Sequence, residues 1–87
     1  QSNSFEGYYI VTTPVGGTNL PPGGKVVVNI FRAGVTFIDG SKKLTLRSED
    51  FVNGVVHLDF LFPIGMNGGY CHHLKIYDRN GKLIAQR

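Results

Sequence analysis

Short segments of alternating apolar and polar residues, separated by Gly- and Pro-rich stretches, are the feature that most constrains the fold of this chain. The alternation is clearest over residues 55–62, where every second side chain is large and apolar. Successive side chains of an extended strand point to opposite faces, so a period of two indicates a strand with one face in a core. The apolar residues are mostly Val, Ile, Leu and Phe, which suit a pleated, half-buried surface. The pattern therefore predicts a chain built from strands.

Turn signals place the ends of these strands. Pro14 is expected to end the first strand, and Asn80-Gly81 accepts the positive φ values of a type I′ hairpin turn. Residues 48–51 have the composition of a single helical turn, and no longer helix is expected. We predict an all-β fold, a six- to seven-stranded antiparallel β-sandwich or small barrel. The predicted strands cover residues 8–13, 25–32, 35–38, 43–48, 55–62, 70–77 and 82–86.

The length of the chain, 87 residues, leaves room for one domain. We expect residues 1–6, which are polar and show no pattern, to form a flexible N-terminal tail, and residues 7–87 to form a single β-sandwich domain. No apolar run approaches the roughly 20 residues that a membrane-spanning helix needs. The sequence therefore gives no reason to expect a membrane partner.

Residues 71–73 (Cys-His-His) carry the densest cluster of metal-capable side chains, and His57 could join them from a neighbouring strand. Adjacent strand residues point to opposite faces, so at most two of the three can converge. The alternative is a buried free cysteine beside two histidines at a strand end. A Cys–His nucleophile would also need a cleft, an orienting third group and an oxyanion site. We therefore predict no catalytic residues, no metal site and no cofactor, and a protein that is not an enzyme.

The predicted strand at residues 25–32 is the candidate partner-binding element. One of its faces is uniformly apolar and suits the core, whereas the other mixes charge, polarity and an aromatic ring. If the strand lies at a sheet edge, its unpaired backbone groups could also accept a strand from a partner. The alternative is an edge covered by the loop at residues 14–24. The predicted partner-binding residues are Lys25, Val27, Asn29, Phe31 and Arg32.

A net charge of +3 makes the chain mildly basic and compatible with an anionic partner. The densest basic stretch contains Lys42, Lys43 and Arg47, which we predict to form a basic surface; solvated strand ends are the simpler interpretation. If these residues shared one face with Lys75 and Arg79 and with exposed aromatic rings, the domain could bind nucleic acid. This remains the alternative to a protein partner, together with a carbohydrate-binding or adhesin module in which Tyr rings stack on sugars.

The order of these elements over residues 8–87 resembles the MAX effectors, small secreted virulence proteins of plant-pathogenic fungi. The shared layout is an opening strand at 8–13, a Gly/Pro loop, a second strand at 25–32 and a final hairpin at 73–86. The resemblance implies two packed three-stranded antiparallel sheets. It also implies a disulfide between a cysteine near the first strand and one just before the fifth. Cys71 stands at the second of these places, and the sequence has no other cysteine.

By this resemblance, the protein would be a secreted, non-enzymatic and monomeric effector that can be delivered into a host cell. It would bind a host protein, with the second strand serving as an exposed docking edge. Nucleic acid would not be the partner.

Overall fold

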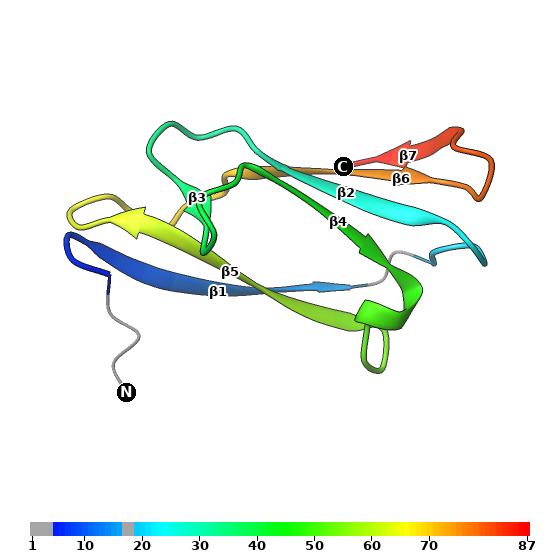
Figure 1. Ribbon diagram of the computed structural model, residues 1–87, viewed down its shortest axis with the longest axis horizontal. Helices are drawn as coiled ribbons and strands as arrows, with labels where there is room; N and C mark the ends of the chain where they lie inside the picture. The colour runs from blue at the N-terminus through cyan, green and yellow to red at the C-terminus, as the bar shows by residue number, and fades with distance from the viewer. Residues whose placement is uncertain (1–4, 17–18) are drawn as a thin grey trace.

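The strands of this protein form two antiparallel sheets that pack face to face. The computed structural model describes residues 5–16 and 19–87, and in Figure 1 the two sheets lie one above the other. The lower sheet has the strand order β1-β5-β3, and the upper sheet has the order β4-β2-β6-β7. The predicted all-β sandwich is therefore confirmed. The strands of the lower sheet are β1 (Tyr8–Gly16), β5 (Val55–Pro63) and β3 (Thr36–Phe37).

The upper sheet has four strands rather than the three implied by the family resemblance. At one edge of this sheet, the turn after β6 folds the C-terminal segment back to pair with β6, as in the predicted final hairpin. A single 3₁₀ turn, η1 (Ser48–Asp50), follows β4, at the place where the sequence predicts one helical turn. The strands of the upper sheet are β4 (Lys43–Arg47), β2 (Lys25–Ile30), β6 (His72–Tyr77) and β7 (Leu83–Gln86).

The core lies between the sheets and is built from the faces that the alternation predicts. Val26 and Val28 of β2 are fully buried, as are Phe60 and Phe62 of β5. The Phe60 ring stacks on Phe37 of β3, with 5.3 Å between ring centroids. Burying a side chain of this size contributes roughly 1.5–3 kcal/mol to folding. The core rows of β2 and β5 therefore hold the two sheets together.

Strand β1 continues to Gly16, so the prediction that Pro14 ends it is wrong. The amide of Ile64 donates to the carbonyl of Gly7 directly opposite it, at 2.9 Å. Hydrogen-bonded and non-hydrogen-bonded pairs alternate along an antiparallel ladder. Counting from Gly7, the pair between Pro14 and His57 is a non-hydrogen-bonded one. Because Pro14 needs no amide hydrogen toward β5, it does not interrupt the strand.

Two of the three Asn-Gly pairs, Asn53-Gly54 and Asn80-Gly81, lie in turns between paired strands, and these turns differ. Asn53 and Gly54 both have positive φ (52° and 79°), the signature of a type I′ turn, and Val52 pairs with Val55 across it. In the β6–β7 connection only Gly81 has positive φ (83°). The predicted hairpin at residues 78–81 is confirmed, but the prediction that its turn is of type I′ is wrong. Asp78 holds this longer turn by accepting the amides of Asn80 and Lys82, each at 2.9 Å.

Strand β2 lies inside its sheet, and the prediction of an exposed edge at residues 25–32 is wrong. It pairs with β4 on one side and with β6 on the other. Both rows of its backbone hydrogen-bonding groups are therefore used within the sheet, and no partner strand can be added there. The strand offers a partner its outward side chains and not its backbone.

Candidate partner-binding face

The outward side of β4, β2 and β6 forms one continuous surface, which we call the outer face. The registers place Val27 between Thr45 and Lys75, and Asn29 between Lys43 and His73. Because directly opposed residues point to the same side of a sheet, side chains from all three strands gather there. They enclose a shallow groove of about 360 Å³. Its lining is Lys25, Val27, Asn29, Lys43, Thr45, Lys75, Tyr77 and Gly81.

Positive charge dominates the outer face. Lys25, Lys43 and Lys75 line the groove, and Arg47 lies opposite Lys25 on β4. None of the outward residues of these three strands is acidic. Cations that share a face without carboxylates between them raise the local potential and attract anionic partners. The ammonium of Lys25 also lies 5.4 Å from the ring centroid of Tyr77.

Val27 forms the apolar floor of the groove. Although it points away from the core, its side chain is only 7% exposed. Lys75 and Thr45 lie directly opposite it on the two neighbouring strands, and the aliphatic stem of a lysine can cover apolar surface. Val27, one of the predicted partner-binding residues, therefore lies on the outer face but is buried there. The groove has an apolar centre and a cationic rim.

Phe31 lies just beyond the end of β2 and is half exposed, at 51%. Its ring meets His73 edge-on at 4.4 Å and lies 5.8 Å from the ring of Tyr70, which is also exposed. The amide of Phe31 donates to the carbonyl of Cys71 at 3.0 Å, which holds the ring next to the outer face. An exposed aromatic cluster of this kind is typical of an interface anchor.

Two of the residues predicted for the site lie elsewhere. The guanidinium of Arg32 donates to the carbonyl of Asn67 at 2.6 Å and lies 5.8 Å from the ring of Phe62, so it turns toward the core side. Lys42 donates to the backbone carbonyl of Arg32 at 2.8 Å. Of the predicted basic surface, only Lys43 and Arg47 join Lys25 on the outer face.

The prediction of a site on β2 did not include Thr45, Lys75 and Tyr77, which complete the groove. The alternation in β6 already places Lys75 and Tyr77 opposite the core residues Leu74 and Ile76. What the sequence did not contain was the pairing of β6 with β2. That pairing is between segments more than forty residues apart, and it alone brings these side chains to Lys25 and Val27.

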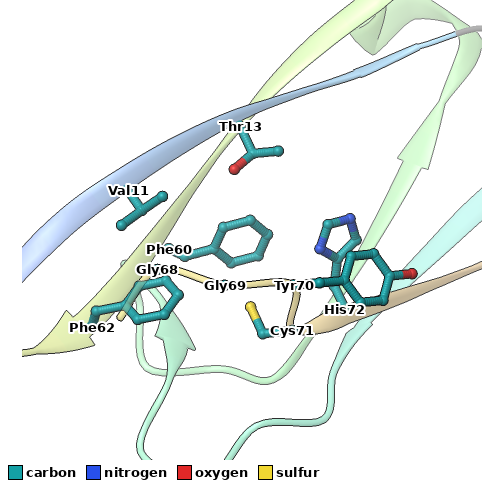
Figure 2. A pocket seen from close by; sticks show the side chains of 9 residues that line it. All are labelled: Val11, Thr13, Phe60, Phe62, Gly68, Gly69, Tyr70, Cys71 and His72. Carbon is teal, nitrogen blue, oxygen red and sulfur yellow. The ribbon is translucent and has the colours of Figure 1, made fainter. Parts of the chain in front are cut away.

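A second feature is an apolar cavity of about 250 Å³ between β1, β5 and the loop that leads into β6 (Figure 2). Cys71 lies at this cavity and is 2% exposed, and burial raises the pKa of its thiol, so the thiol stays protonated. Burial, together with the neighbouring His73, lowers the pKa of His72, which favours the neutral imidazole. The cavity is lined by Val11, Thr13, Phe60, Phe62, Gly68, Gly69, Tyr70, Cys71 and His72.

The cluster at residues 71–73 is divided between the two sides of the upper sheet. Cys71 and His72 face the cavity, whereas His73 lies on the outer face against Phe31. His57 is on β5, opposite Pro14. Within residues 5–16 and 19–87, no three metal-capable side chains come together. In the same part of the chain, no helix has the length and apolar character needed to cross a membrane.

Comparisons of the chain with models of protein families, with curated proteins and with solved structures found no match.

Proposed function

We propose that this protein is a non-enzymatic binding module that holds an acidic partner protein on the outer face of β4, β2 and β6. The observation that carries the proposal is the groove in which Lys25, Lys43 and Lys75 surround the apolar floor made by Val27. A cationic rim around an apolar centre suits a partner whose carboxylates surround an apolar or aromatic side chain. Phe31 extends this surface with an exposed aromatic anchor.

We further propose, from the resemblance in strand layout, that the protein is a secreted effector and that its partner is a protein of a host. In this proposal docking uses side chains of the central strand β2, because its backbone is paired on both sides. A cleavable signal peptide encoded upstream of Gln1 would support secretion. An upstream reading frame that continues into another folded domain would contradict it.

The binding proposal is tested by charge reversal on the outer face. A fluorescent peptide that alternates Glu with Phe or Leu serves as the probe, and its binding is followed by anisotropy at low salt. Lys43→Glu together with Lys75→Glu should lower affinity at least tenfold. Arg79→Glu together with Lys82→Glu, two residues of the β6–β7 turn that do not line the groove, makes the same change in net charge and should alter affinity much less. Equal losses in both proteins would show that net charge alone matters, and would contradict the proposed site.

Single-stranded nucleic acid is a second candidate for the same face. It is favoured by one observation, that four cations (Lys25, Lys43, Arg47 and Lys75) share the outer face with the Tyr77 ring. Against it, the Lys25 ammonium already lies over that ring, whereas base stacking needs an open ring face. We therefore place the acidic protein first.

An oligothymidylate added to the same assay separates the two candidates. Nucleic-acid binding through about four phosphate contacts should give a log–log salt slope of roughly −3, because each contact releases counterions. It should also weaken when Tyr77 is replaced by Leu. Binding of the acidic peptide, which keeps its apolar contribution in salt, should show a shallower slope. A protein that binds neither probe on this face would overturn both candidates.

A further inference from the structure

Strand β1 lies at the edge of its sheet. It pairs with β5 along its whole length, and within residues 5–16 and 19–87 no strand pairs with its other side. The strand spans nine residues and contains no charged side chain. A long, uncharged edge of this kind is a template for pairing with another strand. Tyr8, Tyr9 and Ile10, next to one another on this strand, are all exposed.

The phase of the β1–β5 ladder shows which backbone groups point outward. Gly7 forms a hydrogen-bonded pair with Ile64, so alternate residues from Tyr8 onward form non-hydrogen-bonded pairs with β5. Thr12 is consistent with this, since its hydroxyl reaches the Asp59 carboxylate opposite at 2.6 Å, and side chains are closest in non-hydrogen-bonded pairs. The N–H and C=O groups of Ile10 and Thr12 therefore point to the free edge. The amide of Tyr8 donates to the carbonyl of Phe5 in a turn, so only the carbonyl of Tyr8 is available at the free edge.

The other edges of the two sheets are less suited to pairing. Strand β3 has two residues and β7 has four. Strand β4 has five, and it begins and ends with cations, Lys43 and Arg47, which protect an edge. On β1, Pro14 limits the usable length because it has no amide hydrogen to offer. Tyr8, Ile10 and Thr12 are thus the outward-pointing residues that precede this break.

We propose that this edge binds the same edge of a second copy, in an antiparallel register centred on Ile10. In that register the Ile10 amide of each copy donates to the Ile10 carbonyl of the other, and each Thr12 amide donates to the opposing Tyr8 carbonyl. The outward groups between Tyr8 and Thr12 then have partners, except the Tyr8 amide, which is already bonded within the chain, and the Thr12 carbonyl that would face it. Pro14 falls outside the paired segment.

The side chains of the same register also match. Ile10 meets Ile10 of the other copy, and Tyr8 meets Thr12 on the same side of the joined sheet. On the opposite side Tyr9 meets Val11. Aromatic and β-branched cross-strand pairs are favourable, and no like charges are opposed, because β1 carries none. A second copy therefore pairs most of the outward backbone groups and matches the side chains, in contrast to the monomer expected from the family resemblance.

A dimer formed through this edge leaves the outer face of the other sheet accessible. It would present two outer faces, so the proposal is independent of what that face binds. Joining two edge strands buries less surface than a standard protein–protein interface, and we expect a weak dimer whose population depends on concentration.

Amide hydrogen exchange tests the register residue by residue. Between dilute and concentrated protein, the amides of Ile10 and Thr12 should become more protected as the dimer forms. The amides of Val11 and Thr13 bond to β5 in both states and should not change. Sedimentation measured over the same concentrations should show the mass rising toward that of two chains.

Ile10→Pro removes the outward amide of the central pair and should lower dimer affinity roughly tenfold or more. Its fold should persist, as Pro14 shows at an equivalent position of the ladder. Ile10→Lys, which keeps the amide and opposes two cations, should also weaken the dimer and covers the case in which Ile10→Pro unfolds. A chain that stays monomeric at all concentrations, a dimer unaffected by Ile10→Lys, or concentration-dependent protection confined to β7 would each overturn the proposal.

Discussion

Strands β1 and β2 are built from similar residues, yet they have different surroundings. Both are rich in β-branched residues and have one row of side chains in the core. Strand β2 has neighbours on both sides and presents a cationic outer face, whereas β1 has one neighbour and no charge. The period of two decides which side chains face the core, but not how many neighbours a strand has. The two proposals rest on this difference, because β2 offers a partner only side chains whereas β1 also offers backbone groups.

The largest effect is expected where both sheets depend on one residue. Phe60 stacks on Phe37 within its own sheet and on His72 of the other, at 5.3 and 5.4 Å between ring centroids, and is 1% exposed. Phe60→Ala should lower the free energy of unfolding by about 3–5 kcal/mol, because it enlarges the cavity beside it. Urea unfolding measures this. Phe31→Ala, which removes an exposed ring, is the control and should cost less than about 1 kcal/mol.

Proline substitution separates the central strand from the edge strand directly. Val28→Pro removes an amide from the middle of β2 and leaves a carbonyl of a neighbouring strand unpaired inside the sheet. It should lower the free energy of unfolding by about 3 kcal/mol or more. Thr12→Pro removes an amide that points to the open edge and should cost clearly less. If the two variants were equally unstable by thermal unfolding, the assignment of β1 as an open edge would be wrong.

Much of this fold was predictable because strand faces are encoded locally. The rows containing Val26, Val28, Leu58 and Phe60 are buried as their alternation requires. The lateral order of strands was not predictable, because it depends on pairs such as Val26 with Ile76, fifty residues apart. The prediction that Pro14 ends the first strand was wrong for a related reason. A proline ends a strand only if its amide is needed, and the ladder phase that decides this depends on the position of Gly7 opposite Ile64.

The candidate site was predictable to a similar extent. Lys25 and Asn29 could be assigned to an outward face from β2 alone, and they do line the groove. Arg32 follows the end of that strand in phase with the inward residues Val28 and Ile30, and it turns to Asn67 on the core side. Lys75 lies in the groove only because β6 pairs with β2. A face made by three strands cannot be assembled from the pattern of one.

Acid should weaken the junction of the two sheets, where His72 lies against Phe60. The pKa of His72 is lowered in the fold by burial and by His73, so the unfolded chain takes up the proton first as the pH falls. The contribution of neutral His72 to the free energy of unfolding is therefore expected to be fully present above about pH 6.5. It should decline as the pH falls from there toward the pKa that His72 has in the folded protein. His72→Phe keeps the ring contact and should remove this decline. Urea midpoints measured from pH 8 to pH 5 provide the test.

If the decline persisted in His72→Phe, other groups would have to carry it. His73 is the informative control because it lies on the outer face against Phe31, outside the junction of the two sheets. His73→Phe should leave most of the decline in place and slightly raise the pKa of His72, since it removes a like charge.

The smallest effect concerns the charge that distinguishes the outer face from β1. Cations that share a face repel one another, so neutralising one should stabilise the fold by a few tenths of a kcal/mol at low ionic strength. Lys75→Met removes the charge and keeps an unbranched stem opposite Val27. Any gain from its added apolar character is independent of salt, whereas the part due to repulsion should vanish near 1 M salt, where charges are screened within about 3 Å. Lys82→Met, outside the groove, should show the salt-independent apolar gain without the salt-dependent gain from relieved repulsion. A salt-independent gain in both variants would mean that the outer face tolerates its charges without cost, and the reason for expecting an anionic partner there would be weaker.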